Sequence, residues 1–364
     1  MRKVLLTILA VVALQVVAQD TLQVEEQPEK KMGWLRRVIR GFSEIDENYV
    51  EPQHYNWSVM LQATHTYDYY RLGTSGSGDQ SVWLSPQPNF KVGPYFGWRW
   101  VFLGYTFDLK RVDVDSKDLK QELDFSIYSA QVGVDLYYRH TGSDYRIRRI
   151  NLGKNVNTSV LEGVPFDGIS VGITGANVYY IFNHKRFSYP AAFAQSTIQK
   201  ISCGSWMVGA GYLSNVVEFD HEKLQEKINE RMGPQVAKVD SGLMFNSVRY
   251  YNLSASVGYA YNWVFAKNCL FCSSLSVALA HKHSHGETVN AIKYYFNINN
   301  INIDGIGRFA LVYNNMRWYA GASAIVRAYN YRNSNFAANN IFGSLNLYVG
   351  YNFGARSRYK KNKE

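Results

Sequence analysis

The sequence predicts an all-β protein, an antiparallel transmembrane β-barrel of about 12 strands, with ten to fourteen compatible with the pattern. Apolar and polar residues alternate with period two over runs of up to 16 residues, whereas an average strand has about five or six. Aromatic residues make up 15% of the 364 residues, and Trp and Tyr stand at the ends of the apolar faces, as in membrane strands. The chain also begins with an export signal, which favours an outer-membrane barrel.

The first 18 residues form a secretory signal peptide. Arg2 and Lys3 are the basic start, Val4–Ala13 is apolar, and small residues precede a cleavage site after Ala18. A membrane-anchor helix is the alternative, but Gln residues interrupt the segment. No later stretch has 18 consecutive apolar residues, so a membrane-embedded chain has to span the bilayer as strands.

Charge and cysteine content exclude several classes of protein. The net charge of +10 includes the basic residues of the signal peptide, and the C-terminal tail carries much of the rest. We therefore expect no nucleic-acid partner for this exported chain. Three Cys residues, an odd number, argue against a disulfide-based fold. The mean hydropathy of −0.26 argues against a helical membrane protein.

Four segments divide the chain. Residues 1–18 are the signal peptide, and residues 19–41 are polar enough for a flexible N-terminal segment. Residues 42–354 hold the strand-like runs and form the predicted barrel. Residues 355–364 form a basic C-terminal tail.

The run that begins at Tyr55 shows the strand pattern most clearly. Trp57, Val59 and Leu61 lie on one face of this strand, and polar residues occupy most positions between them, on the other face. The pattern recurs along the chain, with the second and ninth runs weak, and a change of phase near Ser129 indicates a bulge. The candidate strands are 55–70, 81–94, 97–110, 123–140, 169–182, 200–214, 247–265, 269–283, 290–299, 305–314, 316–331 and 341–353.

The connections between strands differ in length. Long polar segments cover residues 141–168 and 183–199. Residues 220–232 have helical composition, with Leu224 and Ile228 four residues apart, and predict a helix on a loop. Other connections are only a few residues long. Long loops on one side and short turns on the other are typical of outer-membrane barrels.

The polar strand faces would line the lumen of the barrel. Arg317 and Arg327 share such a face with Tyr319 and Tyr329 and predict a basic, aromatic patch. Arg residues in a pore favour anions, but they can also pair with inward carboxylates such as Asp108. Because a barrel of about twelve strands lies between filled eight-stranded and open sixteen-stranded barrels, we expect a filled or loop-plugged lumen.

One aromatic segment is too apolar for a free loop. It contains Phe187, Tyr189, Pro190 and Phe193. It would either fold into the lumen as a plug or pack on the rim of the barrel.

Three histidines are the best metal-binding candidates. His281, His283 and His285 would share one face of a strand, where imidazoles could hold Zn²⁺ or Cu²⁺; the alternative is a polar strand end. Ser284 lies between two of them, but adjacent strand residues point to opposite faces, so they do not form a Ser–His pair. We predict no catalytic residues and no cofactor.

Several aromatic and Gly-rich strings stand out along the chain: Pro94–Trp100, Phe102–Tyr105, Tyr179–Asn183, Phe187–Phe193 with Gln195, Gly258–Trp263 and Tyr348–Gly354. Together they resemble a known family, the domain-of-unknown-function 4421 family of Gram-negative outer-membrane proteins, over roughly residues 40–356. The resemblance implies an outer-membrane β-barrel and implies no activity.

These observations predict an integral, porin-like barrel of the cell outer membrane with a non-catalytic structural, channel or surface-binding role. Its expected partners are outer-membrane lipids, lipopolysaccharide and the barrel assembly machinery, and the sequence sets no oligomeric state. Two alternatives are a lipid-modifying hydrolase of the outer membrane and a soluble exported β-protein that binds an apolar ligand. A soluble sandwich would show the same alternation with its apolar face turned inward, but strand length, aromatic ends and the export signal favour the membrane barrel.

Overall fold

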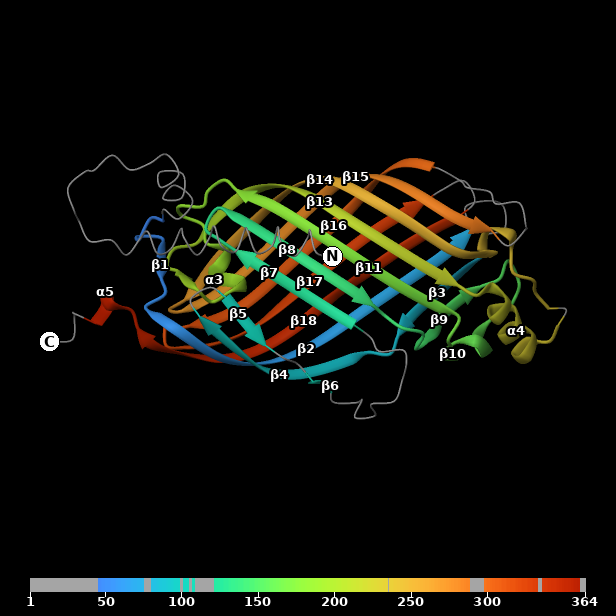
Figure 1. Ribbon diagram of the computed structural model, residues 1–364, viewed down its shortest axis with the longest axis horizontal. Helices are drawn as coiled ribbons and strands as arrows, with labels where there is room; N and C mark the ends of the chain where they lie inside the picture. Colours follow the sequence, from blue (N-terminus) through green and yellow to red (C-terminus); the bar gives the residue numbers. More distant parts are fainter. Residues whose placement is uncertain are drawn as a thin grey trace.

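The structure is a computed structural model, and two antiparallel sheets dominate its described residues (Figure 1). One sheet has sixteen strands within these residues, and the other has two, β1 (Val50–Pro52) and β12 (Thr197–Gln199). The signal peptide and flexible segment predicted for residues 1–41 lie outside the described part. The structure describes residues 45–74, 80–98, 101–104, 107–108, 121–234, 236–288, 298–332 and 336–360.

Long strands make up most of the large sheet, and short strands and helices lie near its two ends. No described helix is both long and apolar enough to cross a membrane. The long strands are β2 (Tyr55–Thr74), β4 (Asn89–Trp98), β7 (Gln121–Tyr128), β8 (Val132–His140), β11 (Ile169–Ile181), β13 (Cys203–Phe219), β14 (Phe245–Ala266), β15 (Cys269–Thr288), β16 (Ile298–Asn314), β17 (Trp318–Arg332) and β18 (Phe336–Ala355). The short strands are β3 (Ser81–Pro86), β5 (Val101–Gly104), β6 (Phe107–Asp108), β9 (Tyr145–Asn151) and β10 (Pro165–Phe166). The helices are α3 (Tyr189–Phe193), α4 (His221–Met232), α5 (Ser357–Lys360) and the 3₁₀ turns η2 (Ser159–Leu161) and η3 (Ser241–Leu243).

The large sheet is a continuous meander that splits at one strand. Its order is β7-β8-β11-β13-β14-β15-β16-β17-β18-β2. Beyond β2 the sheet divides, because the two ends of β2 have different partners. Its C-terminal end pairs with β3, which is followed by β9 and β10, and its N-terminal part pairs with β4, which pairs with β5 and β6. Within the described residues β7 pairs with neither β5 nor β6, so strand pairing does not close the sheet there.

The strand count of about 12 expected from sequence was wrong, because the wall contains several short strands. The expected strand 81–94 divides where Pro86 and Pro88 interrupt the ladder, since proline donates no backbone hydrogen bond. Of the expected strand 97–110, residues 97–98 end β4, and the other described residues, 101–104 and 107–108, are β5 and β6. Two more strands, β9 and β10, form inside the expected loop 141–168.

Three other expected strands had the wrong bounds. Residues 123–140 are not one bulged strand but the hairpin β7–β8, and Ser129 closes its turn by donating its backbone N–H to the Val132 carbonyl (2.9 Å). The runs 290–299 and 305–314 meet in the single strand β16, described from Ile298.

Contacts between distant strands show that the sheet curls around an interior. Arg139 on β8 reaches Asp68 on β2 (Nη1–Oδ1, 3.3 Å), although these strands are far apart in the sheet order. The hydroxyls of Tyr137 on β8 and Tyr329 on β17 are 2.9 Å apart. The inner face of β8 therefore touches strands on the opposite side of the molecule.

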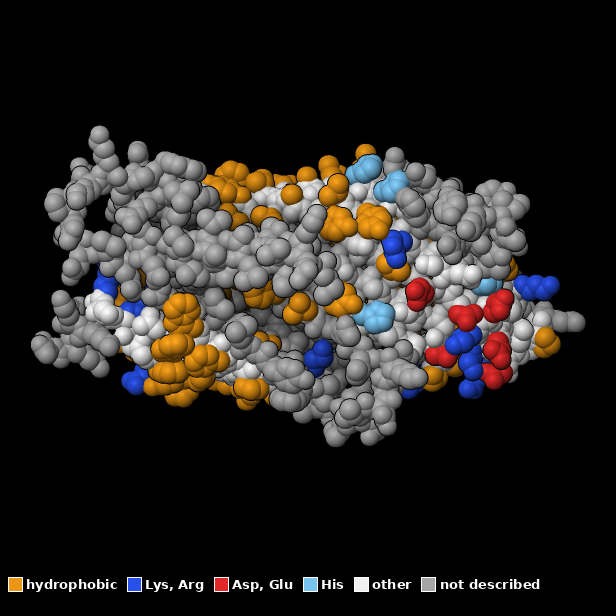
Figure 2. Space-filling model, in the orientation of Figure 1, with side chains coloured by type: hydrophobic (Ala, Val, Ile, Leu, Met, Phe, Trp, Pro, Cys, Tyr) orange, Lys and Arg blue, Asp and Glu red, His pale blue; other side chains and the backbone are white. Residues whose placement is uncertain are grey.

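The wall exposes its apolar face and buries its polar one. Leu253, Leu279 and Leu347 are 64%, 63% and 52% exposed. Hydrophobic side chains accordingly gather over the strands in Figure 2, while charged ones gather at the end that carries α4. The outward face predicted for β2, β13, β14 and β18 is confirmed, because alternate apolar residues of these strands are exposed.

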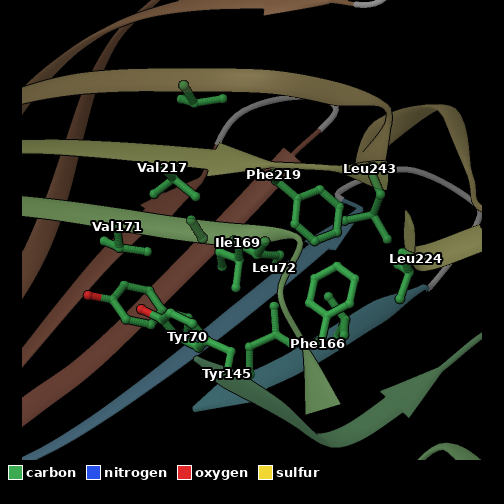
Figure 3. Close-up of a cluster of buried hydrophobic side chains, with 14 of the residues drawn as sticks. Tyr70, Leu72, Tyr145, Phe166, Ile169, Val171, Val217, Phe219, Leu224 and Leu243 are labelled. Atoms are coloured by element: carbon green, nitrogen blue, oxygen red, sulfur yellow. The ribbon is translucent and has the colours of Figure 1, made fainter. Parts of the chain in front are cut away.

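A hydrophobic cap closes one end of the barrel. Phe166, Phe219, Leu224 and Leu243 pack together with inward residues of β2 (Figure 3). The predicted loop helix is confirmed as α4, which buries its apolar face and is capped by the Asp220 side chain accepting the Lys223 N–H. Outside the wall, the ion pair between Lys223 and Asp167 (2.9 Å) lowers the pKa of Asp167 and raises the pKa of Lys223.

Inward tyrosine rings lie over glycines of the neighbouring strand. Tyr319 on β17 is paired with Gly350 on β18, and a Cβ at Gly350 would lie 2.1 Å from the Tyr319 ring. The same arrangement joins Tyr137 to Gly175 at 2.1 Å. These glycines make room for rings that fill the interior.

We predict that Gly350→Ala destabilises the barrel by about 1–3 kcal/mol, since the new methyl group must displace the Tyr319 ring. Thermal unfolding in detergent measures the change. Gly305→Ala is the matched control, because a Cβ at Gly305 meets nothing within 4 Å. Equal melting temperatures for the two variants would contradict the proposed packing.

Candidate functional site

The middle of the lumen holds a set of buried ion pairs. Lys282 Nζ lies 2.9 Å from Asp304 Oδ1, and each of these side chains is at most 1% exposed. Arg308 pairs with Asp135 across the lumen, at the same depth of burial as the pair between Arg139 and Asp68. Buried charges are stable only when paired and hydrogen-bonded, so these pairs require their strands to stay in contact.

Further hydrogen bonds saturate two of the carboxylates. Asp304 also accepts from the Asn252 side-chain amide (2.7 Å) and the Asn330 backbone N–H (3.2 Å). Asp135 accepts from the Ser126 and Tyr128 hydroxyls (2.7 and 3.2 Å). A network satisfied in this way holds its members rigidly.

Three predicted lumen residues are buried. Tyr319 exchanges a hydrogen bond with Ser58 (2.7 Å), and Tyr329 with Tyr137. Arg327 is 2% exposed and lies 4.6 Å from the centre of the Tyr137 ring, a cation–π contact. Its guanidinium forms no ion pair within the described part of the chain.

The lumen position predicted for Arg317 was wrong. Strand β17 begins only at Trp318, and Arg317 lies in the preceding turn, where Asn315 accepts its backbone N–H. The side chain is exposed and donates from Nε to the Tyr351 hydroxyl (2.9 Å). Asp108 pairs in register with Lys91, but its side chain lies outside the described residues.

The aromatic segment enters the lumen as α3. Ser188 caps this short helix, and Pro190 occupies its first turn. Phe187 and Tyr189 are both 0% exposed, and the Tyr189 hydroxyl donates to Ser274 on β15 (3.0 Å). Phe193 packs against Tyr189 with the rings tilted and their centres 4.7 Å apart. We call residues 183–199 the plug segment.

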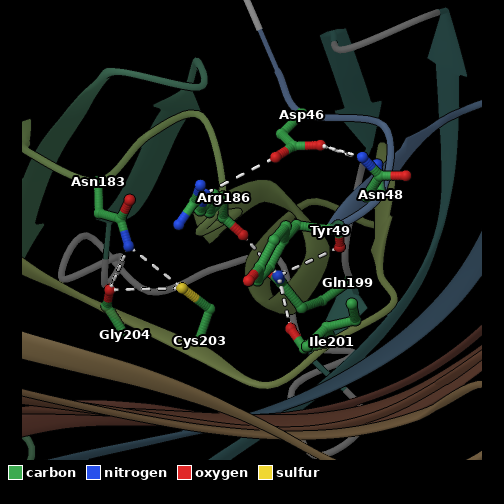
Figure 4. Close-up of polar contacts among 9 residues, drawn as sticks. All are labelled: Asp46, Asn48, Tyr49, Asn183, Arg186, Gln199, Ile201, Cys203 and Gly204. Carbon is green, nitrogen blue, oxygen red and sulfur yellow. Dashed lines mark hydrogen bonds and ion pairs between the residues drawn. The ribbon is translucent and has the colours of Figure 1, made fainter.

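A single glutamine holds the plug segment in place (Figure 4). The Gln199 amide donates to the carbonyls of Tyr49, Arg186 and Ile201, and its oxygen accepts the Ser188 N–H (2.8 Å). Gln199 therefore ties the start of the plug segment to its end and to the residues before the barrel.

The segment before the barrel binds the plug segment at several further points. The Asp46 N–H donates to the Lys185 carbonyl (2.8 Å), and the Asp46 carboxylate pairs with Arg186 (3.7 Å). β1 then pairs with β12 in a sheet separate from the wall. The plug segment is thus attached to the wall by side chains and to residues 45–53 by backbone pairing.

Little free space remains beside the central charges. A cavity of about 20 Å³ lies among Asn177, Tyr179 and Arg308, which is room for about one water molecule. The described side chains around Arg308 therefore leave room for little more than water.

Two of the three histidines proposed as metal ligands have described side chains, and both lie at the outward phase of β15. His281 is exposed and His283 half-buried, whereas their neighbours Lys282 and Ser284 are buried in the interior. The His285 side chain lies outside the described residues. Among the described side chains, no group of three His, Cys, Asp or Glu could hold a metal ion.

Sequence reasoning missed most of the ion-pair residues and Gln199. Asp68, Arg139 and Lys282 each occur at the inward phase of a long strand, which was a usable signal for a charged lumen. Asp68 and Arg139 lie on strands distant in sequence, so their pairing could not be predicted, whereas Asp304, the partner of Lys282, lies on the next strand, β16.

Comparisons with known proteins give one family and distant structural likenesses. A family model with the description "Domain of unknown function (DUF4421)" matches residues 44–353. No curated protein matches the chain. Similar solved structures include the outer membrane protease OmpT from Escherichia coli (7% identity, TM-score 0.36, 82% of this chain and 97% of that chain covered).

Two further structures are similar over most of the chain. One is the translocator domain of the autotransporter NalP from Neisseria meningitidis (8% identity, TM-score 0.33, 82% and 88% covered). The other is the toluene transporter TodX from Pseudomonas putida (7% identity, TM-score 0.28, 83% and 91% covered). At these identities no residue's role transfers to this chain.

We predict that Asp135→Asn lowers the free energy of unfolding by about 3–5 kcal/mol, because it leaves Arg308 buried without its charge partner. Denaturant titration in detergent measures this loss. The double variant Asp135→Leu with Arg308→Leu is expected to lose less than the single one, since no charge remains unpaired. A single variant as stable as the wild type would disprove the structural importance of the pair.

Proposed function

We propose that this chain, which belongs to the family of domain of unknown function DUF4421, is an integral outer-membrane β-barrel with a closed lumen and a non-catalytic role at the cell surface. In this proposal the barrel is an anchor. The folded cap that contains α4 is the part presented outside the cell.

The observation that carries the proposal is that apolar side chains lie outside and charged side chains inside, the reverse of a soluble protein. Aliphatic residues such as Leu279 are more than half exposed on the wall, while Lys282 and Arg308 are 0% and 2% exposed in the interior. A soluble protein would be destabilised by both arrangements. A bilayer favours the first, and paired charges in a closed lumen permit the second.

The orientation follows from the connections. Short turns at residues 129–131, 267–268 and 315–317 lie at the end where β2 begins and β18 ends, and the cap residues 141–168 and 220–244 lie at the opposite end. Outer-membrane barrels place short turns in the periplasm and long loops outside. The plug segment would accordingly lie on the periplasmic side.

The two alternative functions receive less support. A soluble apolar-ligand protein would turn the apolar strand faces inward, and here they are exposed. A hydrolase using Ser284 would need an imidazole beside it, but the Ser284 hydroxyl is buried against the Tyr331 hydroxyl (2.7 Å). His283 lies at the opposite phase of the strand.

A gated channel is a second candidate, favoured by how the plug segment is attached. β12 pairs only with β1 among the described strands, not with the wall. Side-chain hydrogen bonds join the plug segment to the wall, such as Tyr189 to Ser274 and Gln195 to Tyr348 (3.0 and 2.7 Å). Such an element can leave without breaking a strand ladder.

We predict that Leu347→Arg lowers the free energy of unfolding by about 2–4 kcal/mol in a bilayer, the cost of an Arg on a lipid-facing strand. Val160→Arg in the cap is the matched control, because both residues are 52% exposed; we expect it to change stability by no more than about 0.5 kcal/mol. Denaturant titration in vesicles measures both. If Leu347→Arg were as harmless as the control, the wall would face water and the proposal would fail.

We also predict that the wild-type barrel carries no steady current across a planar bilayer, because ion pairs and plug fill its lumen. Replacing residues 184–198 by a short Gly–Ser linker then separates the two candidates. A conducting variant supports the gated channel, and a silent one supports the anchor. Stepwise conductance from the wild-type protein would contradict the closed lumen.

A further inference from the structure

An apolar groove of about 970 Å³ lies on the wall where β4, β2, β18 and β17 are neighbours. Its volume is at the upper end of the range of small-molecule sites, roughly 300–1,000 Å³. Its lining side chains are almost all apolar or aromatic and include Val59, Leu61, Phe96, Trp318, Val349 and Tyr351.

A cationic side chain, Arg317, lies against Tyr351, one of the residues that line this groove. The Arg317 guanidinium lies 5.4 Å from the centre of the Tyr351 ring and donates from Nε to its hydroxyl. Tyr351 in turn packs on Trp318, with ring centres 4.6 Å apart. Stacking leaves the two Nη groups of Arg317 without a carboxylate among the described residues, so they are available to an anion from outside.

The position of the groove in the barrel restricts the occupant. Trp318 and Tyr351 lie beside the short turn at residues 315–317, at the end of the barrel where β2 begins and β18 ends. If the orientation proposed above holds, this end lies in the periplasmic leaflet of the membrane. That leaflet of an outer membrane consists of glycerophospholipids, and aromatic residues of a barrel lie at headgroup level.

We infer that this groove binds one glycerophospholipid, with its phosphate on Arg317 and its acyl chains along Val59, Leu61 and Val349. The inference rests on the proposed membrane function. A free phosphate would use only the exposed guanidinium, whereas a phospholipid also covers the apolar lining. The combination of an anion-binding group and a long apolar groove therefore favours the lipid.

Lipid retention by the purified full-length chain tests the inference. After delipidation in detergent, the protein is titrated with dioleoylphosphatidylglycerol, and bound lipid is counted by native mass spectrometry. We expect saturation at one tightly held lipid. Arg317→Gln should weaken binding on the order of tenfold, since a hydrogen-bonded charge contact is lost. Val349→Trp should weaken it as well, since the larger ring blocks the part of the groove along which an acyl chain would lie.

Leu279→Trp is the matched control, because Leu279 on β15 is also exposed on the wall but does not line the groove. We expect it to bind like the wild type. Dioleoylglycerol, which lacks the phosphate, should bind the wild type as weakly as the phospholipid binds Arg317→Gln. Heat-induced unfolding of each variant shows that it is folded.

Three results would overturn the inference. They are unchanged binding by Arg317→Gln and Val349→Trp, equal losses in Val349→Trp and the Leu279→Trp control, and displacement of the lipid by inorganic phosphate alone. Failure of the proposed function gives a different result, release of the protein from membranes without detergent. If the protein is an integral barrel but retains no specific lipid, only lipid binding in the groove is disproved, and the proposed function stands.

Discussion

Charge pairing inside the curled sheet is the constraint on which the rest of the structure depends. The wall directs alternate side chains inward, so Lys, Arg and Asp residues at those positions lose water and need partners. Arg139 finds Asp68, and Arg308 finds Asp135, only because the sheet curls until distant strands meet. The pairs add little net stability compared with an apolar core of equal volume. What they determine is which strands face each other, and hence the shape of the barrel.

The two ends of the barrel are closed by different means. At the end with the long connections, α4 and the short strands supply a hydrophobic core that resembles the interior of a soluble domain. At the other end the plug segment enters as a capped helix whose apolar side chains pack against the wall, and polar contacts, many of them through Gln199, add to this packing.

The sequence predicted the faces of the strands better than their number. Alternation from Trp57 to Leu61 depends only on strand geometry, so it needed no knowledge of neighbours. The split into β3 and β4, and the hairpin in place of a bulge near Ser129, depend on which strands are adjacent. The prediction for Arg317 was wrong because it extended the alternation of β17 into the preceding turn, where the alternation does not apply. The pairing of Arg139 with Asp68 and of Arg308 with Asp135 depends on how the sheet curls, which periodicity does not contain.

The plug segment has a consequence for the order in which the molecule is built. It lies between β11 and β13, but its partners come later in the chain: Asn262 donates to the Ser188 carbonyl, and Tyr348 on β18, the last strand, accepts from Gln195. The segment therefore has no complete binding site while the barrel is being assembled, and its aromatic side chains cannot be fully buried until the last strand is in place. Its entry into the lumen is the step that marks a finished wall.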